Sequence, residues 1–182
     1  MRVIAGQYRG RVLKNPQGLQ TRPTSDRLRE TLFNVLAPRL EGARFLDLCA
    51  GTGAIGIEAL SRGAAFVTFV DRVHKMCALV EENLDLLGVP EELTEVVKSD
   101  AAEYLKRTRE GGHEWRAGTE PWYVIYFDPP YSSDYLPVIK ELGAHAPDVG
   151  PSTSPRSPLD GTRQICLLSA QSSRQVCLIP RR

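Results

Sequence analysis

The sequence lacks long hydrophobic runs, and none approaches the ~20 apolar residues that a membrane-spanning helix needs. Polar residues follow at once after the first six positions, so we expect no signal peptide. The four cysteines have neither metal-ligand nor redox spacing: Cys49, Cys77, Cys166 and Cys177. These absences predict a cytoplasmic protein with reduced thiols, no metal and no membrane attachment.

The chain also has little net charge, +1 overall, but its charge is unevenly distributed. Residues 1–44 carry nine Arg and Lys against three acidic residues, a net of +6 that leaves −5 for the remainder. Eight of the nine are arginines, whose guanidinium fork suits phosphate. This asymmetry favours a polyanionic partner, RNA or DNA first, over a basic surface without a function.

A length of 182 residues predicts a single folded unit with a core, in three segments. Residues 1–23 form a basic arm with a short hairpin that projects Arg9 and Arg11. Residues 24–142 form the main domain. In residues 143–163, ten of 21 positions are Pro, Gly or Ser, so residues 143–182 are predicted to be an atypical tail with short edge strands at 165–168 and 176–179.

Strand and helix patterns alternate through the main domain. Apolar runs at 44–49, 66–70, 93–97 and 123–127 read as strands, and helical patterns occur at 24–36, 54–62, 73–87, from 101 and at 135–142. This order predicts an α/β fold with a doubly wound, mostly parallel sheet. Such sheets bind ligands at the carboxyl ends of their strands. Four features fall there: the glycine-rich turn, Asp71, Asp100 and Asp128.

The glycine-rich turn at residues 51–56 has the pattern G-x-G-x-x-G and opens a helix. Asp71 lies twenty positions after Gly51, as expected for a carboxylate that binds a ribose. Both NAD and S-adenosylmethionine contain an adenosine ribose, so the motif alone leaves both cofactors open. Gly51 and Gly53 have a simpler interpretation as residues that permit a tight turn.

Two further carboxylates favour S-adenosylmethionine. Asp47 lies four residues before Gly51, where it suits a ligand's ammonium group and would repel a pyrophosphate. Asp100 follows the third strand, where it suits an adenine amino group. The simpler interpretation of Asp100 is a cap on the next helix.

The stretch Asp128-Pro129-Pro130-Tyr131 follows the apolar strand at 123–127. The Asp128 carboxylate and the Pro129 carbonyl offer two hydrogen-bond acceptors to one amino group, and proline adds no competing N–H. Tyr131 supplies a ring for a flat substrate. The stretch therefore suits a nucleobase with an exocyclic amino group, although Asp-Pro-Pro is also ordinary turn chemistry.

Together these residues resemble the class I S-adenosylmethionine-dependent methyltransferases that modify exocyclic amines. The matching segments are Phe45–Gly53, Asp71, Asp100 and Asp128–Tyr131. Three amino-terminal segments are similar to the bacterial ribosomal small subunit methyltransferase D family, which methylates guanine N2 in 16S rRNA: Arg9–Arg11, Thr21–Arg27 and Arg29–Asn34. The resemblance covers about residues 1–142.

The resemblance implies a Rossmann-like class I fold, S-adenosylmethionine as cofactor, and 16S rRNA or the small ribosomal subunit as partner of a monomeric enzyme. The implied cofactor-binding residues are Asp47, Gly51, Gly53, Asp71 and Asp100. The implied catalytic residues are Asp128, Pro129, Pro130 and Tyr131. The resemblance also implies that the basic hairpin and the Arg22–Arg29 segment grip rRNA, with Arg9, Arg11, Arg22 and Arg27 as the RNA-binding residues.

The carboxyl end departs from the family pattern. After Leu142 the family predicts a hydrophobic strand ending in an acidic residue and then a hairpin with a Tyr-Gly turn, and residues 143–182 contain neither. Three alternatives stay open at this point. They are a DNA or protein amine methyltransferase with the same cradle, a non-catalytic RNA-binding remnant, and an NAD-dependent oxidoreductase.

Overall fold

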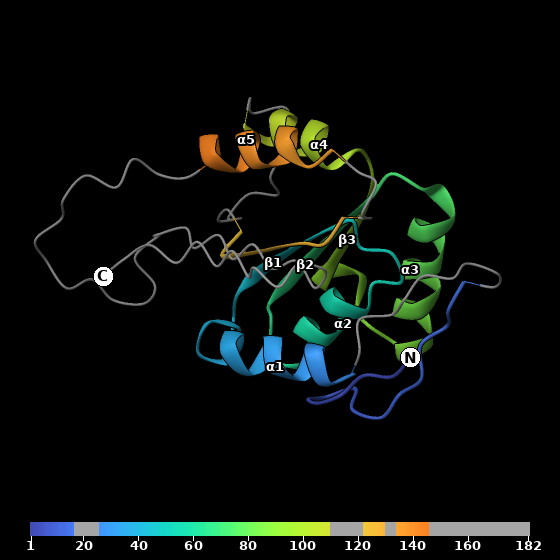
Figure 1. Ribbon diagram of the computed structural model, residues 1–182. Coiled ribbons are helices and arrows are strands. Elements are labelled where there is room, and N and C mark those ends of the chain that lie inside the picture. Colours follow the sequence, from blue (N-terminus) through green and yellow to red (C-terminus); the bar gives the residue numbers. More distant parts are fainter. Residues whose placement is uncertain (17–25, 110–121, 130–133, 146–182) are drawn as a thin grey trace, which may run out of the picture.

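The computed structural model describes residues 1–16, 26–109, 122–129 and 134–145 (Figure 1). The predicted site residues Arg22, Pro130 and Tyr131 lie outside the described residues, as do the two apolar runs of the tail.

Four parallel strands form the central sheet in the order β3-β2-β1-β4. Their bounds are Arg44–Leu48 for β1, Phe66–Asp71 for β2, Thr94–Lys98 for β3 and Val124–Phe127 for β4. Leu48, at the end of β1, is the register partner of both Val70 and Phe127. The predicted parallel sheet is therefore confirmed.

Helices cover both faces of the sheet. On one face lie α1 (Asp26–Leu36), α2 (Ala54–Ser61) and α3 (His74–Leu87), and on the other lie α4 (Ala101–Arg109) and α5 (Leu136–His145) (Figure 1). Short 3₁₀ turns, η1 (Ala37–Arg39) and η2 (Glu91–Leu93), precede β1 and β3. The architecture is the predicted doubly wound α/β class.

The core lies in two layers because a parallel sheet with helices on both faces is buried on both faces. Phe45, Val67 and Phe69 pack toward α1, α2 and α3. Leu46 and Val70 pack toward α4 and α5. Every residue of β4 and all but the first residue of β1 and β2 are buried. This explains why these strands appear in the sequence as short, nearly continuous apolar runs.

Helix α1 buries a different face from the one that its leucines predict. Leu28, Leu32, Val35 and Leu36 have helical spacing, but the buried residues are Arg29, Phe33 and Leu36, and Val35 is 54% exposed. The Phe33 ring stacks on Phe45 of β1, with ring centroids 6.5 Å apart. An aromatic contact with the sheet thus determines the orientation of the helix.

Arg29 is fully buried, and its Nη2 donates to Asp26 Oδ1 at 2.8 Å and to the Arg2 carbonyl at 2.7 Å. These contacts join α1 to the amino-terminal arm. The expectation that Arg29 grips RNA with its basic neighbours is therefore wrong, because its guanidinium lies inside the protein.

The predicted hairpin of the arm is reduced to one antiparallel bridge, Arg2 with Val12. Backbone hydrogen bonds from Val3 N to Arg11 O and from Leu13 N to Met1 O flank it. Val3 and Leu13 are buried in the same core as α2 and the sheet.

Helix α2 holds the beginning of the arm through two side chains. The fully buried Glu58 accepts the Ile4 N–H at 2.7 Å and the Ala5 N–H at 3.0 Å. Ser61 Oγ accepts the Tyr8 N–H at 2.9 Å. The arm is thus a fixed layer on α2, the helix that the glycine-rich turn opens.

Candidate active site

The carboxyl ends of the strands bring the predicted site positions to one edge of the sheet. Because Leu48 pairs with Val70 and with Phe127, the turn that follows β1 lies between Asp71 and Asp128. Asp100 follows β3, whose last residue, Lys98, pairs with Asp71. The edge therefore combines a glycine-rich turn with carboxylates from three strand ends.

Asp71 fixes the glycine-rich turn. Its Oδ2 accepts the Gly51 N–H at 2.9 Å, and its Oδ1 accepts the Val73 N–H at 2.8 Å. A carboxylate has about four lone-pair positions, so each oxygen retains acceptor capacity for a ligand hydroxyl. Asp71 thus orders the turn and keeps the chemistry that a ribose diol requires.

Asp47 lies beneath the turn rather than at its surface. It is 1% exposed, and its Oδ2 accepts the Gly56 N–H at 2.9 Å. Burial raises the pKa of Asp47 to about 7, the Gly56 N–H opposes this, and the charges of Asp71 and Asp128 add to it. Asp47 therefore anchors the first turn of α2 and presents almost no surface to a ligand.

Besides Gly51, whose φ of 56° is also left-handed, glycine is required at two positions of the turn. Gly53, the residue that precedes α2, has φ 75°, which side chains rarely adopt. At Gly56 a Cβ would collide with the Phe69 ring of β2, so α2 can lie directly on the sheet only because this residue is glycine. Both positions match the roles of glycines in a nucleotide-binding turn.

Asp100 caps α4, as the simpler interpretation predicted. Its Oδ1 accepts the Ala102 N–H at 2.9 Å and the Glu103 N–H at 3.3 Å. The residue is exposed at the edge of the sheet. Capping therefore does not prevent a contact between this carboxylate and a ligand.

Asp128 and Pro129 follow β4 and are half-buried. The hydroxyl of the buried Tyr126 donates to Asp128 Oδ2 at 3.3 Å, which orients the carboxylate. A half-buried carboxylate and the carbonyl of a residue without an N–H thus lie next to the glycine-rich turn. Of the predicted amine cradle, Asp128 and Pro129 are described, and Pro130 and Tyr131 are not.

The carboxylates at this edge of the sheet are suited to binding S-adenosylmethionine. Carboxylates accept hydrogen bonds from ribose hydroxyls and from amino groups, and their negative charge complements a sulfonium. The buried Asp47, by contrast, offers no surface that would repel a pyrophosphate, so that part of the expectation is not supported. A Cβ placed on Gly51 would meet no atom of the described residues within 4 Å, so these residues leave the turn open on that side.

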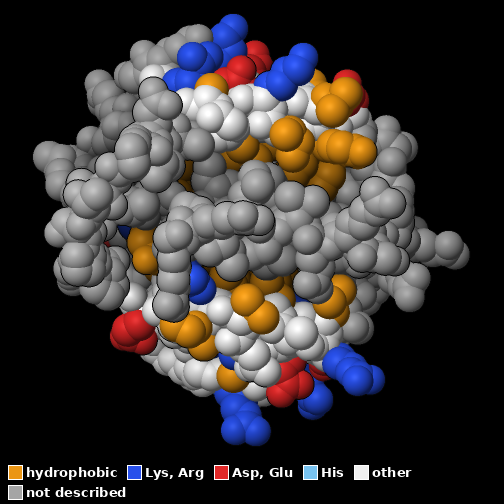
Figure 2. Space-filling view, turned by 60° about the vertical axis from the view of Figure 1, so that its left-hand side comes forward, with side chains coloured by type: hydrophobic (Ala, Val, Ile, Leu, Met, Phe, Trp, Pro, Cys, Tyr) orange, Lys and Arg blue, Asp and Glu red, His pale blue; other side chains and the backbone are white. Residues whose placement is uncertain are grey.

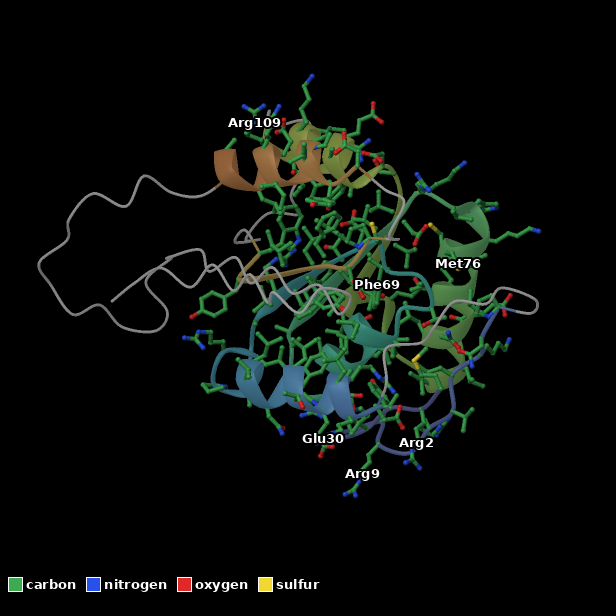
Figure 3. The ribbon with its side chains drawn as sticks, viewed as in Figure 1. Arg2, Arg9, Glu30, Phe69, Met76 and Arg109 are labelled. Carbon is green, nitrogen blue, oxygen red and sulfur yellow. The ribbon has the colours of Figure 1, made fainter. Side chains whose placement is uncertain are left out.

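The predicted RNA-binding arginines that the structure describes lie on or next to the arm. Arg9, Arg11 and Arg27 are exposed, and Arg11 Nη2 donates to the Leu86 carbonyl of α3 at 3.0 Å. The labelled Arg2 and Arg9 project from the lower edge of the molecule in Figure 3. Figure 2 shows Lys and Arg side chains at this lower edge and also at the upper edge, over α4 and α5.

Sequence reasoning missed two polar residues that hold the site together, Glu58 and Asn83. Both are fully buried. Asn83 lies on the apolar face of α3, one helical turn after Val80 and one before Leu87, which are both buried. A polar side chain within an apolar stripe is the signal that would have identified it.

The part of the chain that the structure describes offers neither a metal site nor a membrane-spanning helix. No group of three or more His, Cys, Asp or Glu there is arranged to hold a metal ion. No described helix is long and apolar enough to cross a membrane.

Comparison with known proteins shows the family to which this chain belongs. The family model "Conserved hypothetical protein 95" matches residues 1–146. The chain is 39% identical over 142 residues to "Putative rRNA methyltransferase YlbH" of Bacillus subtilis, which covers 78% of this chain and 73% of the relative. It is 40% identical over 136 residues to "Ribosomal RNA small subunit methyltransferase D" of Escherichia coli. That match covers 75% of this chain and 63% of the relative.

A solved structure shares the fold. The structure titled "Putative methyltransferase yhhF from Escherichia coli" superposes with a TM-score of 0.63 at 35% identity, over 79% of this chain and 71% of that one. The sequence resemblance and the predicted Rossmann-like fold are thus confirmed. The chain belongs to the conserved hypothetical protein 95 family, which is the family of ribosomal RNA small subunit methyltransferase D.

Proposed function

We propose that this protein transfers the methyl group of S-adenosylmethionine to the N2 amino group of a guanine in 16S rRNA. One observation carries the proposal. The register of β1 with β4 sets Asp128 and Pro129, two acceptors for one amino group, beside the glycine-rich turn. When bound, S-adenosylmethionine supplies a methyl group activated by the positive sulfonium.

The residues of the turn and its neighbours hold the cofactor. Asp71 accepts hydrogen bonds from the ribose hydroxyls, and Gly51 lets the backbone approach the ligand. Asp100 meets the adenine amino group. Asp47 supports the cofactor site indirectly, because it accepts the Gly56 N–H and thereby fixes the start of α2 beneath the turn. Gly53 adopts a left-handed backbone conformation and so allows the turn its shape before α2.

Asp128 and Pro129 orient the amino group that is methylated. The guanine NH₂ is a poor nucleophile because its lone pair is delocalised into the ring. Hydrogen bonds from its two N–H groups to the Asp128 carboxylate and the Pro129 carbonyl favour a pyramidal nitrogen with an available lone pair. That lone pair would form the N–CH₃ bond as the S–CH₃ bond breaks, S-adenosylhomocysteine would be the leaving product, and the methylated nitrogen would release one proton to solvent. The acceleration then comes mainly from proximity and alignment.

A base within an RNA helix must leave its stack before it reaches such a site. We assign Tyr131 to stack on the extruded guanine and Pro130 to the same amine cradle. Both assignments rest on the sequence.

The basic arm binds the rRNA backbone. Arg9, Arg11 and Arg27 contact phosphates, and Arg22, near the carboxyl end of the arm, joins them. The proposed division is a basic arm at residues 1–23, a methyltransferase domain at 24–142 and an atypical tail at 143–182. A substrate of 16S rRNA or the small subunit makes the cytoplasm the place of action, and we expect a monomer.

The test is methylation by the purified full chain with tritiated S-adenosylmethionine on four substrates: small ribosomal subunits, protein-free 16S rRNA, DNA and protein. The proposal predicts label in rRNA that digestion recovers as N2-methylguanosine. Label only in DNA or protein would instead support the other amine methyltransferases. RNA binding without binding of S-adenosylhomocysteine would indicate a non-catalytic remnant, and binding of NAD in its place an oxidoreductase.

A further inference from the structure

The side-chain amide of Asn83 joins two parts of the protein that are distant in the sequence. Its Oδ1 accepts the Lys14 N–H at 2.7 Å, and its Nδ2 donates to the Lys14 carbonyl at 3.3 Å. The same Nδ2 donates to the Thr52 carbonyl at 3.1 Å. Lys14 lies near the end of the described part of the arm, and Thr52 is the second residue of the glycine-rich turn.

Asn83 uses its acceptor and both of its N–H groups in these contacts, and it is fully buried. A buried amide that loses any of these partners leaves a polar group unsatisfied, at a cost comparable to a hydrogen bond. The three contacts therefore favour a single arrangement of the arm relative to the turn.

The surroundings of Asn83 support a rigid connection. From the same helix, α3, Glu82 Oε2 accepts from Lys14 Nζ at 2.9 Å, and the Leu86 carbonyl accepts from Arg11 at 3.0 Å. Within the turn, Asp71 holds the Gly51 N–H at 2.9 Å. The turn is thus fixed at Gly51 by Asp71 and at Thr52 by Asn83.

We propose that Asn83 is a positioning residue that couples RNA binding on the arm to cofactor binding at the glycine-rich turn. This inference rests on the proposed function. Because the connection is rigid, a displacement of Lys14 that RNA binding imposes on the arm is transmitted through Asn83 to the Thr52 carbonyl and so to the turn. RNA and cofactor then favour the same arrangement of the turn, so each ligand strengthens the binding of the other.

Two neighbouring substitutions separate this role from ordinary anchoring of the arm. Asn83→Asp keeps an acceptor for the Lys14 N–H but turns a carboxylate oxygen toward the Lys14 and Thr52 carbonyls, so the link to the turn is lost. Glu82→Gln changes only the exposed contact with the Lys14 ammonium, which contributes little to the rigid connection and in which the amide oxygen can still accept. It is the matched control.

The experiment measures the dissociation constant of S-adenosylhomocysteine by equilibrium dialysis, with the full chain, in the absence and presence of saturating protein-free 16S rRNA. For the wild-type protein and Glu82→Gln we expect rRNA to tighten binding at least about fivefold. For Asn83→Asp we expect a ratio within about twofold of one. Binding stoichiometry and urea unfolding give the folded fraction of each variant.

The coupling ratio is a property of the folded molecules, so a merely structural role of Asn83 would lower stability and leave the ratio at its wild-type value. That result would overturn the inference. A wild-type protein that binds both ligands independently would overturn it as well, while the proposed function would stand. A wild-type protein that binds neither ligand would overturn both.

Discussion

The Asp71 carboxylate accepts the Gly51 N–H at 2.9 Å across twenty residues of sequence. This bond joins the end of β2 to the turn that follows β1, and the second oxygen of Asp71 holds the Val73 N–H before α3. The spacing of twenty residues between Gly51 and Asp71 predicts a carboxylate that binds a ribose. The same two residues are also hydrogen-bonded to each other within the protein. One side chain orders the turn and faces the cofactor that we propose.

Asp71→Ala removes both of these bonds. Hydrogen bonds to a charged group contribute about 1.5–3 kcal/mol each, so we expect binding of S-adenosylhomocysteine to weaken by more than about tenfold. Asp71→Asn keeps one acceptor oxygen and should give an intermediate loss. Calorimetric titration of the two variants measures the effect, and unchanged affinity in Asp71→Ala would remove Asp71 from the cofactor site.

Asp128→Asn replaces one of the two proposed acceptors for the guanine amino group with a group that also carries N–H donors. We expect methylation of 16S rRNA to fall on the order of 10²-fold, because the amine loses its alignment, while S-adenosylhomocysteine still binds. Asp134→Asn is the matched control. Asp134 caps α5 by accepting the Leu136 N–H at 3.1 Å, and asparagine caps equally well. Equal activities of the two variants would contradict the role of Asp128.

Asp47→Asn tests the buried carboxyl group beneath the turn. Because its pKa is raised from 3.8 to about 7, the folded protein retains this proton where the unfolded chain has released it. The contribution of Asp47 to stability is therefore complete below the unfolded pKa and is lost as the pH rises through about 7.

The amide introduced by Asp47→Asn does not titrate, and its oxygen can still accept the Gly56 N–H. At about 1.4 kcal/mol per pKa unit, the variant should gain a few kcal/mol relative to wild type between about pH 4 and about pH 7. Urea unfolding across this range measures the difference. Parallel stability curves would mean that Asp47 does not titrate there.

Glu58→Ala breaks the buried attachment of the arm to α2. It leaves the Ile4 and Ala5 N–H groups and the Arg62 guanidinium, which donates to Glu58 at 2.7 Å, without this acceptor. We expect a loss of about 3 kcal/mol in the free energy of unfolding and faster trypsin cleavage within the arm. The exposed Glu30 provides the control, since Glu30→Ala should change stability by less than about 0.5 kcal/mol.

Arg9→Ala with Arg27→Ala removes two exposed cations from the proposed RNA surface. Each lost phosphate contact should reduce the slope of log affinity against log salt by about 1, with weaker binding of 16S rRNA. Lys106→Ala removes an exposed cation from α4, at the opposite edge of the molecule (Figure 1). Filter binding at several salt concentrations separates these variants, and equal slopes would exclude the arm as the RNA surface.

The sequence by itself determined the sheet and the edge where the site lies. Apolar runs such as Val124–Phe127 are buried on both faces, so their composition alone identifies them as central strands. The turn at 51–56 needs glycine for reasons that act locally, namely a left-handed backbone at Gly53 and direct packing on Phe69 at Gly56. Parallel strands with right-handed connections then bring their carboxyl ends together.

The roles of the buried polar side chains were decided only by the tertiary structure. Arg29 was expected in the segment that grips rRNA, but its guanidinium is buried and donates to Asp26 and to the Arg2 carbonyl. Asp47 was expected at the ligand and lies beneath the turn. Asn83 joins Lys14 to Thr52. A buried charge or amide needs hydrogen-bond partners, and here these are groups that are distant in the sequence. Which of them come within about 3 Å depends on how the chain folds and not on the local sequence.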